Sequence, residues 1–218
     1  MVVPNYIPDP IEVPNNVSDQ KYALRVAFIG RVSILHALSI LIVAGVAVLD
    51  LPRPNLTIDA ILLGACLLVL SLVRIETRGT KADVIMSGAL LPVLMLALAF
   101  TAKELQLRDI PAWAPLIGLA TALTYTLLSG KDFSFIGQWF LAFIASNVAI
   151  AAIALTYHKD PTQAAKAIAL NSVTLTYYVY DLASLLARRR IGEELGAVVD
   201  LYRDVLNFGG YFVRCLRH

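Results

Sequence analysis

The segment 195–213, LGAVVDLYRDVLNFGGYFV, decides the fold of this chain, because it is apolar enough to enter a membrane yet carries Asp200, Arg203 and Asp204. A charge at mid-membrane costs about 2.5–3.5 kcal/mol, so these three residues together oppose insertion by roughly 7–10 kcal/mol. The preceding segment 170–187, LNSVTLTYYVYDLASLLA, is interrupted in the same way by Asp181. The final segment therefore needs other helices or water around it, and its charges indicate a functional site.

The composition describes a multi-pass membrane protein. Of the 218 residues, 58% are hydrophobic and 16% are charged, and the mean hydropathy is +0.71, values far from those of a soluble domain. The net charge of +2 and the scattered basic residues give no indication of nucleic-acid binding. His36, His158 and His218 are far apart, and no nucleophile–base arrangement is present, so we expect neither a metal cluster nor an enzyme.

Apolar stretches of about 20 residues can cross the hydrocarbon core, and they predict an all-α membrane bundle of six transmembrane helices around a charged seventh. The expected spans are 32–50, 56–75, 84–102, 111–129, 135–157 and 163–187, with the seventh at 194–214. Short connections make sequential helices antiparallel neighbours. The expected organisation is a Pro-rich, extended, uncleaved tail at 1–24, followed by one membrane domain at 25–218.

Local signals support the helix ends and the orientation. Asp160-Pro161 is a typical helix start, Asn55 can cap the second span, and Gly192 can separate the last two segments. With the N-terminus in the cytoplasm, ten lysines and arginines flank that side and five the other, which favours this orientation. We expect an integral protein of a prokaryotic cytoplasmic membrane. The seventh segment either crosses the membrane fully or re-enters it, and the sequence leaves both paths open.

Polar residues follow one face of each of the last two helices. On the sixth they are Asn171, Thr174, Tyr178, Asp181, Ser184 and Arg188, and on the seventh Glu193, Asp200, Arg203, Asp204, Asn207, Tyr211 and Arg214. The short turn 188–193 should direct these faces toward each other. It would place Asp181 at the depth of Asp200 or Asp204, which predicts a shared carboxylate site.

Two interpretations of this site remain open. Two carboxylates about 4 Å apart repel by about 4 kcal/mol at an effective dielectric constant near 20, so they would share a proton or hold a cation, and would respond to pH. Alternatively, Arg203 and Arg74 neutralise the acids in a static, salt-bridged core.

Three motifs in the same order resemble the transmembrane Bax-inhibitor-motif family. They are GKDFSF at 130–135, YD at 180–181 and VDLYRDVLNF at 199–208, with a looser match from Arg31-Val32-Ser33 onward. The resemblance covers most of residues 25–215. It implies a seven-helix fold with the last helix surrounded by the first six, and a pH-sensitive calcium leak gated by a pair of aspartates.

Carried over by position, the resemblance implies that the gating pair is Asp181 with Asp204, that Asp200 is the neighbouring acid, and that calcium can bind at the pair. It also implies a latch arginine on the second span, for which Arg74 is the positional candidate. The chain departs from the family at Arg203, where an apolar residue is usual, and its last turn is about two residues shorter. A fixed cation at Arg203 would act as a built-in counter-ion, bonded to Asp200 or Asp204.

The expected function is therefore a pH-sensitive cation (calcium) leak channel. The alternative is a non-conducting relative that serves as a structural or accessory subunit of a larger membrane complex, docking a membrane-protein partner through residues 1–20. Lys131 and Asp132 have two interpretations as well: a hinge that contacts the seventh helix, or a solvated turn, which we favour. Beyond the lipid bilayer and possible calcium ions, no cofactor is expected.

Overall fold

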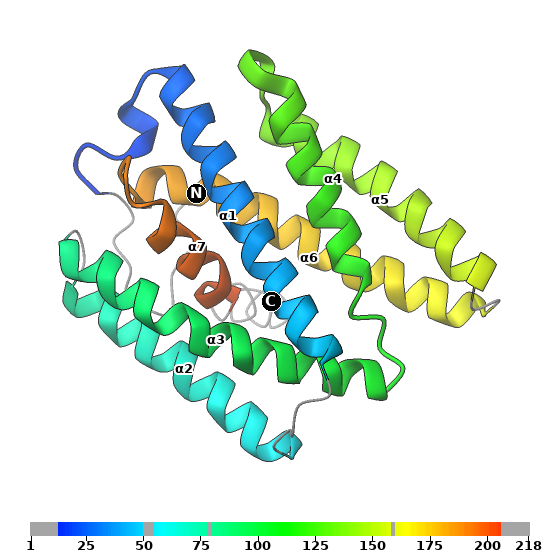
Figure 1. The fold of residues 1–218 in the computed structure, drawn as a ribbon. Helices are drawn as coiled ribbons and strands as arrows, with labels where there is room; N and C mark the ends of the chain where they lie inside the picture. The colour runs from blue at the N-terminus through cyan, green and yellow to red at the C-terminus, as the bar shows by residue number, and fades with distance from the viewer. Residues whose placement is uncertain (1–12, 50–54, 78–79, 158–159, 206–218) are drawn as a thin grey trace, which may run out of the picture.

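The described part of the chain folds as a bundle of seven α-helices, seen here in a computed structural model (Figure 1). The structure describes residues 13–49, 55–77, 80–157 and 160–205, with the backbone alone at 74–77 and 81. The helices are α1 (Tyr22–Val48), α2 (Leu56–Thr77), α3 (Lys81–Leu107), α4 (Ala114–Ser129), α5 (Phe135–Tyr157), α6 (Pro161–Arg188) and α7 (Glu194–Arg203). The same ranges contain two 3-10 turns: η1 (Val17–Asp19) precedes α1, and η2 (Gly130–Asp132) joins α4 to α5. Within the described ranges there is no strand, which confirms the all-α class.

Four of these helices are long and apolar enough to cross a membrane. They are α1, the part of α2 from Leu56 to Val73, the part of α3 from Ala82 to Leu107, and α5. With 16 residues, α4 is about 24 Å long, short of the roughly 30 Å hydrocarbon core. Although α6 has 28 residues, its polar face lowers its mean hydropathy. It is therefore not among the helices that are apolar enough to cross a membrane. Membrane crossing by α4, α6 and the seventh segment stays a prediction.

Most helix ends agree with the sequence signals. The side chain of Asp160 accepts a hydrogen bond from the Thr162 amide at 2.8 Å, and that of Asn55 accepts one from the Ile58 amide at 3.0 Å. However, α1 begins at Tyr22, ten residues before the predicted span. Arg25 and Arg31 fit this added part of α1, because Arg31 is largely exposed and pairs with Glu194 at 2.7 Å.

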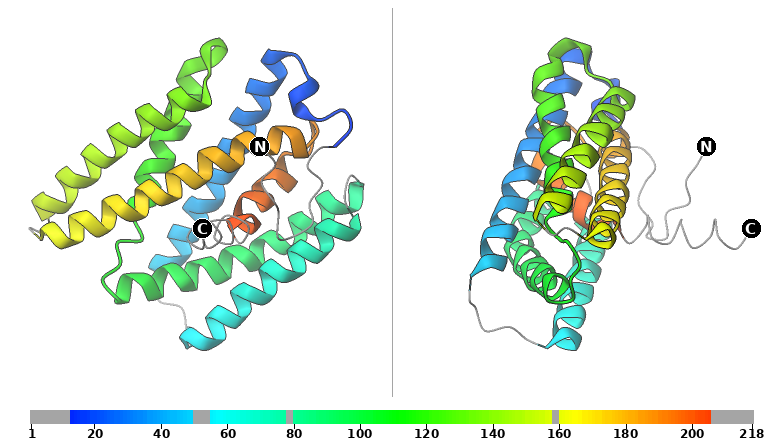
Figure 2. Two further views of the ribbon diagram at one scale, coloured as in Figure 1. Left: turned by 180° about the vertical axis from the view of Figure 1, so that it is seen from behind. Right: turned by 90° about the vertical axis from the view of Figure 1, so that its right-hand side faces the viewer.

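The helices form two groups with α1 and α7 between them (Figures 1 and 2). One group is the α2–α3 hairpin, and the other is formed by α4, α5 and α6. From this central position α7 packs chiefly on α1 and α3, and also on α2 and α6. Among the described residues, α4 packs on α5, α6 and α1, and α5 packs on α4 and α6. Whether all six other helices surround the seventh segment stays a prediction, because its residues 206–214 lie outside the described ranges.

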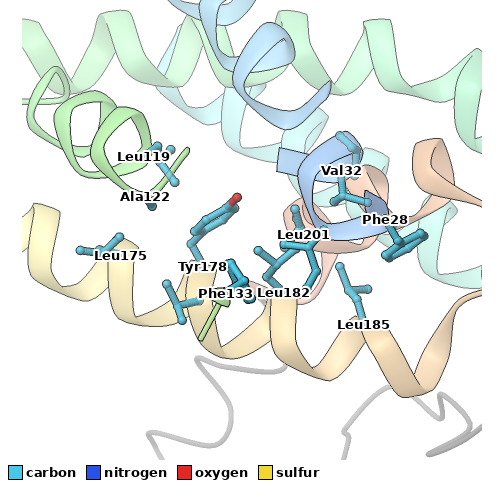
Figure 3. Close-up of a cluster of buried hydrophobic side chains, with 14 of the residues drawn as sticks. Phe28, Val32, Leu119, Ala122, Phe133, Leu175, Tyr178, Leu182, Leu185 and Leu201 are labelled. Atoms are coloured by element: carbon cyan, nitrogen blue, oxygen red, sulfur yellow. The ribbon is translucent and has the colours of Figure 1, made fainter. Parts of the chain in front are cut away.

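The hydrophobic core lies where the two groups meet. Its main cluster joins α1, α6 and α7 through residues such as Phe28, Leu182 and Leu201 (Figure 3). A second cluster joins α2 and α3 to α7, with Leu70, Leu94 and Val199 at its centre. Because α7 contributes to both clusters, it is held on two sides by apolar packing.

Residues 13–20 do not extend away from the bundle as the expected tail would. Val13, Asn16 and Val17 are buried, and η1 packs on α6 and α1. The apolar valines explain the difference, since they give this Pro-rich segment surface to bury. Residues 1–12, the rest of the segment expected to dock a partner, lie outside the described ranges.

Candidate functional site

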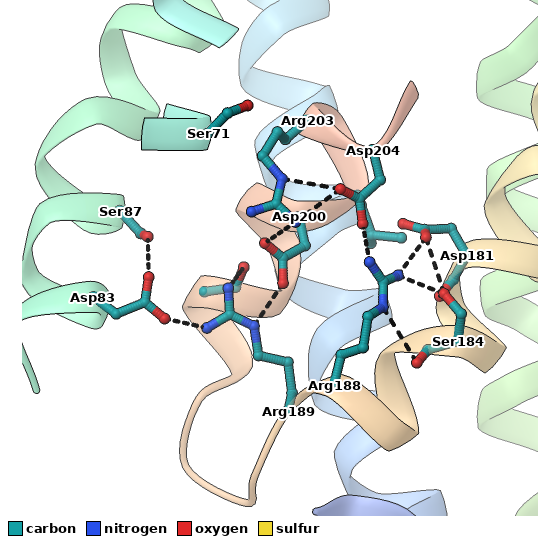
Figure 4. Close-up of polar contacts among 12 residues, drawn as sticks. Ser71, Asp83, Ser87, Asp181, Ser184, Arg188, Arg189, Asp200, Arg203 and Asp204 are labelled. Atoms are coloured by element: carbon teal, nitrogen blue, oxygen red, sulfur yellow. Dashed lines mark hydrogen bonds and ion pairs between the residues drawn. The ribbon is translucent and has the colours of Figure 1, made fainter. Parts of the chain in front are cut away.

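Seven buried charged side chains form one continuous chain of ion pairs at the centre of the bundle (Figure 4). In order, they are Asp83, Arg189, Asp200, Arg203, Asp204, Arg188 and Asp181. Acid and base alternate throughout, and both ends are aspartates. We call this set the ion-pair chain. It runs from α3 across α7 to α6.

The turn between α6 and α7 creates this arrangement. Arg188 is the last residue of α6, and Arg189 has extended backbone angles (φ −129°, ψ 159°). The helix therefore ends between the two arginines, and their side chains reach different sides of α7: Arg188 pairs with Asp181 and Asp204, whereas Arg189 pairs with Asp83 and Asp200. Gly192 then adopts a positive φ of 94°, which favours glycine and lets the chain turn into α7.

Arg189 joins α3 to α7. Its Nη1 lies 2.5 Å from Oδ2 of Asp83, and its Nε lies 2.6 Å from Oδ2 of Asp200. Its Nη2 donates to the carbonyl of Gly196 at 3.1 Å. Burial alone would lower the pKa of this guanidinium, but the charges of Asp200 and Asp83 raise it above the usual value for arginine. Arg189 is therefore a permanent cation.

Arg203 joins the two acids on its own helix. Its Nη2 lies 2.8 Å from Oδ1 of Asp204 and 3.2 Å from Oδ1 of Asp200. The spacing of Asp200, Arg203 and Asp204 puts all three on one face of the helix. Arg203 thus makes the contact with Asp200 and Asp204 that is expected of the built-in counter-ion.

Arg188 joins α6 to α7. Its Nη1 donates to Oδ2 of Asp204, and its Nη2 donates to Oδ1 of Asp181 at 2.6 Å. The hydroxyl of Ser184 donates to the same Asp181 oxygen at 3.0 Å. The other oxygen of Asp181, Oδ2, is buried and has no hydrogen-bond partner in the part of the chain that the structure describes.

The ion-pair chain is cut off from solvent. No member is more than 6% exposed. Its seven members are four carboxylates and three guanidinium groups. Glu193, 3.8 Å from Arg189, is partly exposed and lies at its rim. Removing one partner of a buried pair costs about 3–5 kcal/mol, so these contacts restrain α7 strongly.

Aromatic residues border the ion-pair chain on the side of α1. The ring of His36 stacks on Tyr178 of α6 at 5.4 Å and lies 4.9 Å from Tyr202 of α7. The Tyr178 hydroxyl donates to Ser33 at 2.8 Å, and the hydroxyls of Ser39 and Tyr202 are 2.6 Å apart. These contacts tie α1 to α6 and α7.

The structure brings together most of the residues that the sequence singles out. Asp181, Asp200, Asp204 and Arg203 all belong to the ion-pair chain. Arg74 lies on α2, but its side chain is outside the described residues, so its expected role as a latch stays a prediction.

Lys131 and Asp132 are elsewhere, both exposed in η2, which contacts α1 and α4. This agrees with the solvated turn rather than the hinge. No group of three metal-ligating side chains gathers among the described residues, and Arg188 occupies the place between Asp181 and Asp204 where calcium was expected.

Three members of the ion-pair chain were missed from the sequence as site residues: Asp83, Arg188 and Arg189. The two arginines belong to the run 188–190, which the positive-inside rule assigns to a solvated loop. Arg188 does fall on the predicted polar face of the sixth helix, and that periodicity was the available signal. Asp83 stands at the start of α3, where an acid is ordinary, so no local signal marks it.

The comparisons with known proteins leave the family open. No family model matches the chain, and neither a curated protein nor a solved structure matches it. The resemblance to the Bax-inhibitor-motif family therefore depends on the three sequence motifs.

Proposed function

We propose that this protein is a pH-sensitive cation leak channel, with calcium as the expected ion, and that the ion-pair chain is its gate. One observation carries the proposal: Oδ2 of Asp181 is buried and has no hydrogen-bond partner among the described residues, while Oδ1 of the same carboxylate is held by Arg188. A buried, unpaired charge is costly unless a proton or a cation neutralises it. The resemblance to a calcium-leak family supports the same function.

In this proposal the gate is the Arg188 bridge between Asp181 and Asp204. The bridge ties α6 to α7 through two charge-assisted hydrogen bonds. A proton on Asp181 weakens one half of the bridge, so α7 is held less tightly as the pH falls. The other charged neighbours, Asp200 and Arg203, lie on α7 itself and move with it, while Asp83 and Arg189 stay on the far side of α7.

Calcium flux into dye-loaded proteoliposomes at several pH values tests the proposal. We expect the flux to rise as the pH falls, and Asp181→Asn, which resembles the protonated state, to leak at all pH values without a pH response. The matched control is Asp132→Asn, since Asp132 is an exposed acid outside the ion-pair chain. An unchanged pH response in Asp181→Asn would show that the pair is not the sensor.

The second candidate is a non-conducting subunit of a larger membrane complex. The position of Arg188 favours it, because a fixed cation fills the place between Asp181 and Asp204. Under this function the ion-pair chain is a static core. A folded, reconstituted protein with no flux at any pH would favour this candidate over the channel.

A further inference from the structure

Residues 13–20 are hydrogen-bonded along the end of α6, at the turn that supplies the bridging arginines. The amide of Val13 donates to the carbonyl of Ala187 at 3.1 Å, and the amide of Val17 donates to the carbonyl of Arg189 at 2.9 Å. In return, Nε of Arg190 donates to the carbonyl of Pro14 at 3.0 Å. Together these three bonds hold residues 187, 189 and 190, at the end of α6 and the start of the turn to α7.

The segment is also anchored by apolar burial. Val17 is fully buried and belongs to the main core cluster with Phe28 and Leu185, while Val13 is 5% exposed. Asn16 caps η1 by accepting from the Asp19 amide at 3.2 Å. A solvated tail would leave both valines exposed to water. Because both are buried, the segment is part of the fold.

The position of the segment connects it to the ion-pair chain. Arg188 and Arg189 diverge around α7 where α6 ends and the backbone becomes extended at 189, and the Val17 amide donates to the carbonyl of Arg189. This bond restrains the backbone from which the two guanidinium groups extend. A shift here would disturb the contacts to Asp204 and Asp200 together.

We propose that residues 13–20 form a strap that restrains the α6–α7 turn and keeps the Arg188 and Arg189 bridges closed. Releasing the strap loosens the turn and α7. If the protein is the channel proposed above, release also raises the leak, so the strap is an autoinhibitory contact. The restraint itself does not depend on ion conduction.

Hydrogen–deuterium exchange of the full-length protein in lipid nanodiscs tests the strap. Val17→Ser removes the buried side chain, and the matched control Asp19→Ser introduces the same residue at an exposed position of the same segment. We expect amide exchange in 188–204 to increase about tenfold in Val17→Ser and to stay unchanged in Asp19→Ser. Faster exchange confined to residues 13–20, with 188–204 unchanged, would overturn the proposal.

Arg190→Gln provides a second variant if Val17→Ser fails to fold. It removes only the bond from the Arg190 side chain to the Pro14 carbonyl, so we expect a smaller increase in exchange over the same amides, and no increase would overturn the strap. Calcium flux on the same samples separates the two proposals. Faster exchange in 188–204 with no flux at any pH supports the strap and contradicts the channel.

Discussion

Arg188 and Arg189 are adjacent in the chain but serve opposite sides of α7. Arg188 pairs with Asp181 and Asp204, and Arg189 pairs with Asp83 and Asp200. Their side chains part where α6 ends and the backbone becomes extended at Arg189, beyond the helical periodicity that the sequence shows. For this reason the periodicity of α6 and α7 predicted the acidic faces, whereas the positions of the two arginines required the structure.

Removing Arg188 should destabilise the protein more than removing an exposed arginine. Arg188→Gln leaves Asp181 and Asp204 without their shared cation in a buried site, which costs about 3–5 kcal/mol of unfolding free energy. The control Arg31→Gln breaks a largely exposed pair with Glu194 and should cost at most about 1 kcal/mol. Denaturant unfolding in detergent would measure both. Equal losses would mean that the Arg188 bridge is not an anchor of α7.

Arg203→Leu should increase calcium binding. The substitution removes the cation between Asp200 and Asp204, so the ion-pair chain would lose one positive charge. A buried site with more uncompensated acid attracts a divalent cation more strongly. Isothermal titration with calcium would show tighter binding in Arg203→Leu than in the unmodified protein. Strong binding by the unmodified protein, with no gain in the variant, would contradict this role of Arg203.

The close packing of α7 against the turn depends on Gly196. A Cβ atom at this position would come within 2.5 Å of Nη1 of Arg189, so the guanidinium would have to move away from Asp83 and Asp200. We expect Gly196→Ala to cost about 1–3 kcal/mol in unfolding free energy. Gly30→Ala is the matched control, because a Cβ on α1 at Gly30 meets nothing within 4 Å, and it should cause no loss. Similar stabilities of the two variants would argue against this packing.

At the level of helices, the lengths of the apolar stretches and the capping residues were sufficient to predict most of the helices. Asp160 and Asn55 start α6 and α2 as predicted, because capping is a local interaction between neighbouring residues. The start of α1 was placed too late, since Arg25 and Arg31 end the apolar run without ending the helix. Apolar periodicity detects the part of a helix that meets lipid or core, and charged end turns extend beyond it.

The arrangement of the whole bundle was less predictable. Short loops indicated antiparallel neighbours, and α2–α3, α4–α5 and α5–α6 are such pairs. Contacts between distant segments, such as α1 with α3 or Asp83 with Arg189, depend on how the groups of helices pack, which no local pattern specifies. The same holds for Val13 and Val17, because their burial site forms only once α6 and α1 are in place.

The central claim is that Asp181, whose buried Oδ2 has no hydrogen-bond partner among the described residues, takes up a proton as the pH falls. Infrared difference spectroscopy of the purified protein between pH 8 and pH 6 measures this directly through the carbonyl stretch of a protonated carboxylic acid. We predict that one buried carboxylic acid appears as the pH falls, and that its band is lost in Asp181→Asn and kept in Asp132→Asn. A spectrum without such a band, or a band that persists in Asp181→Asn, would contradict the account.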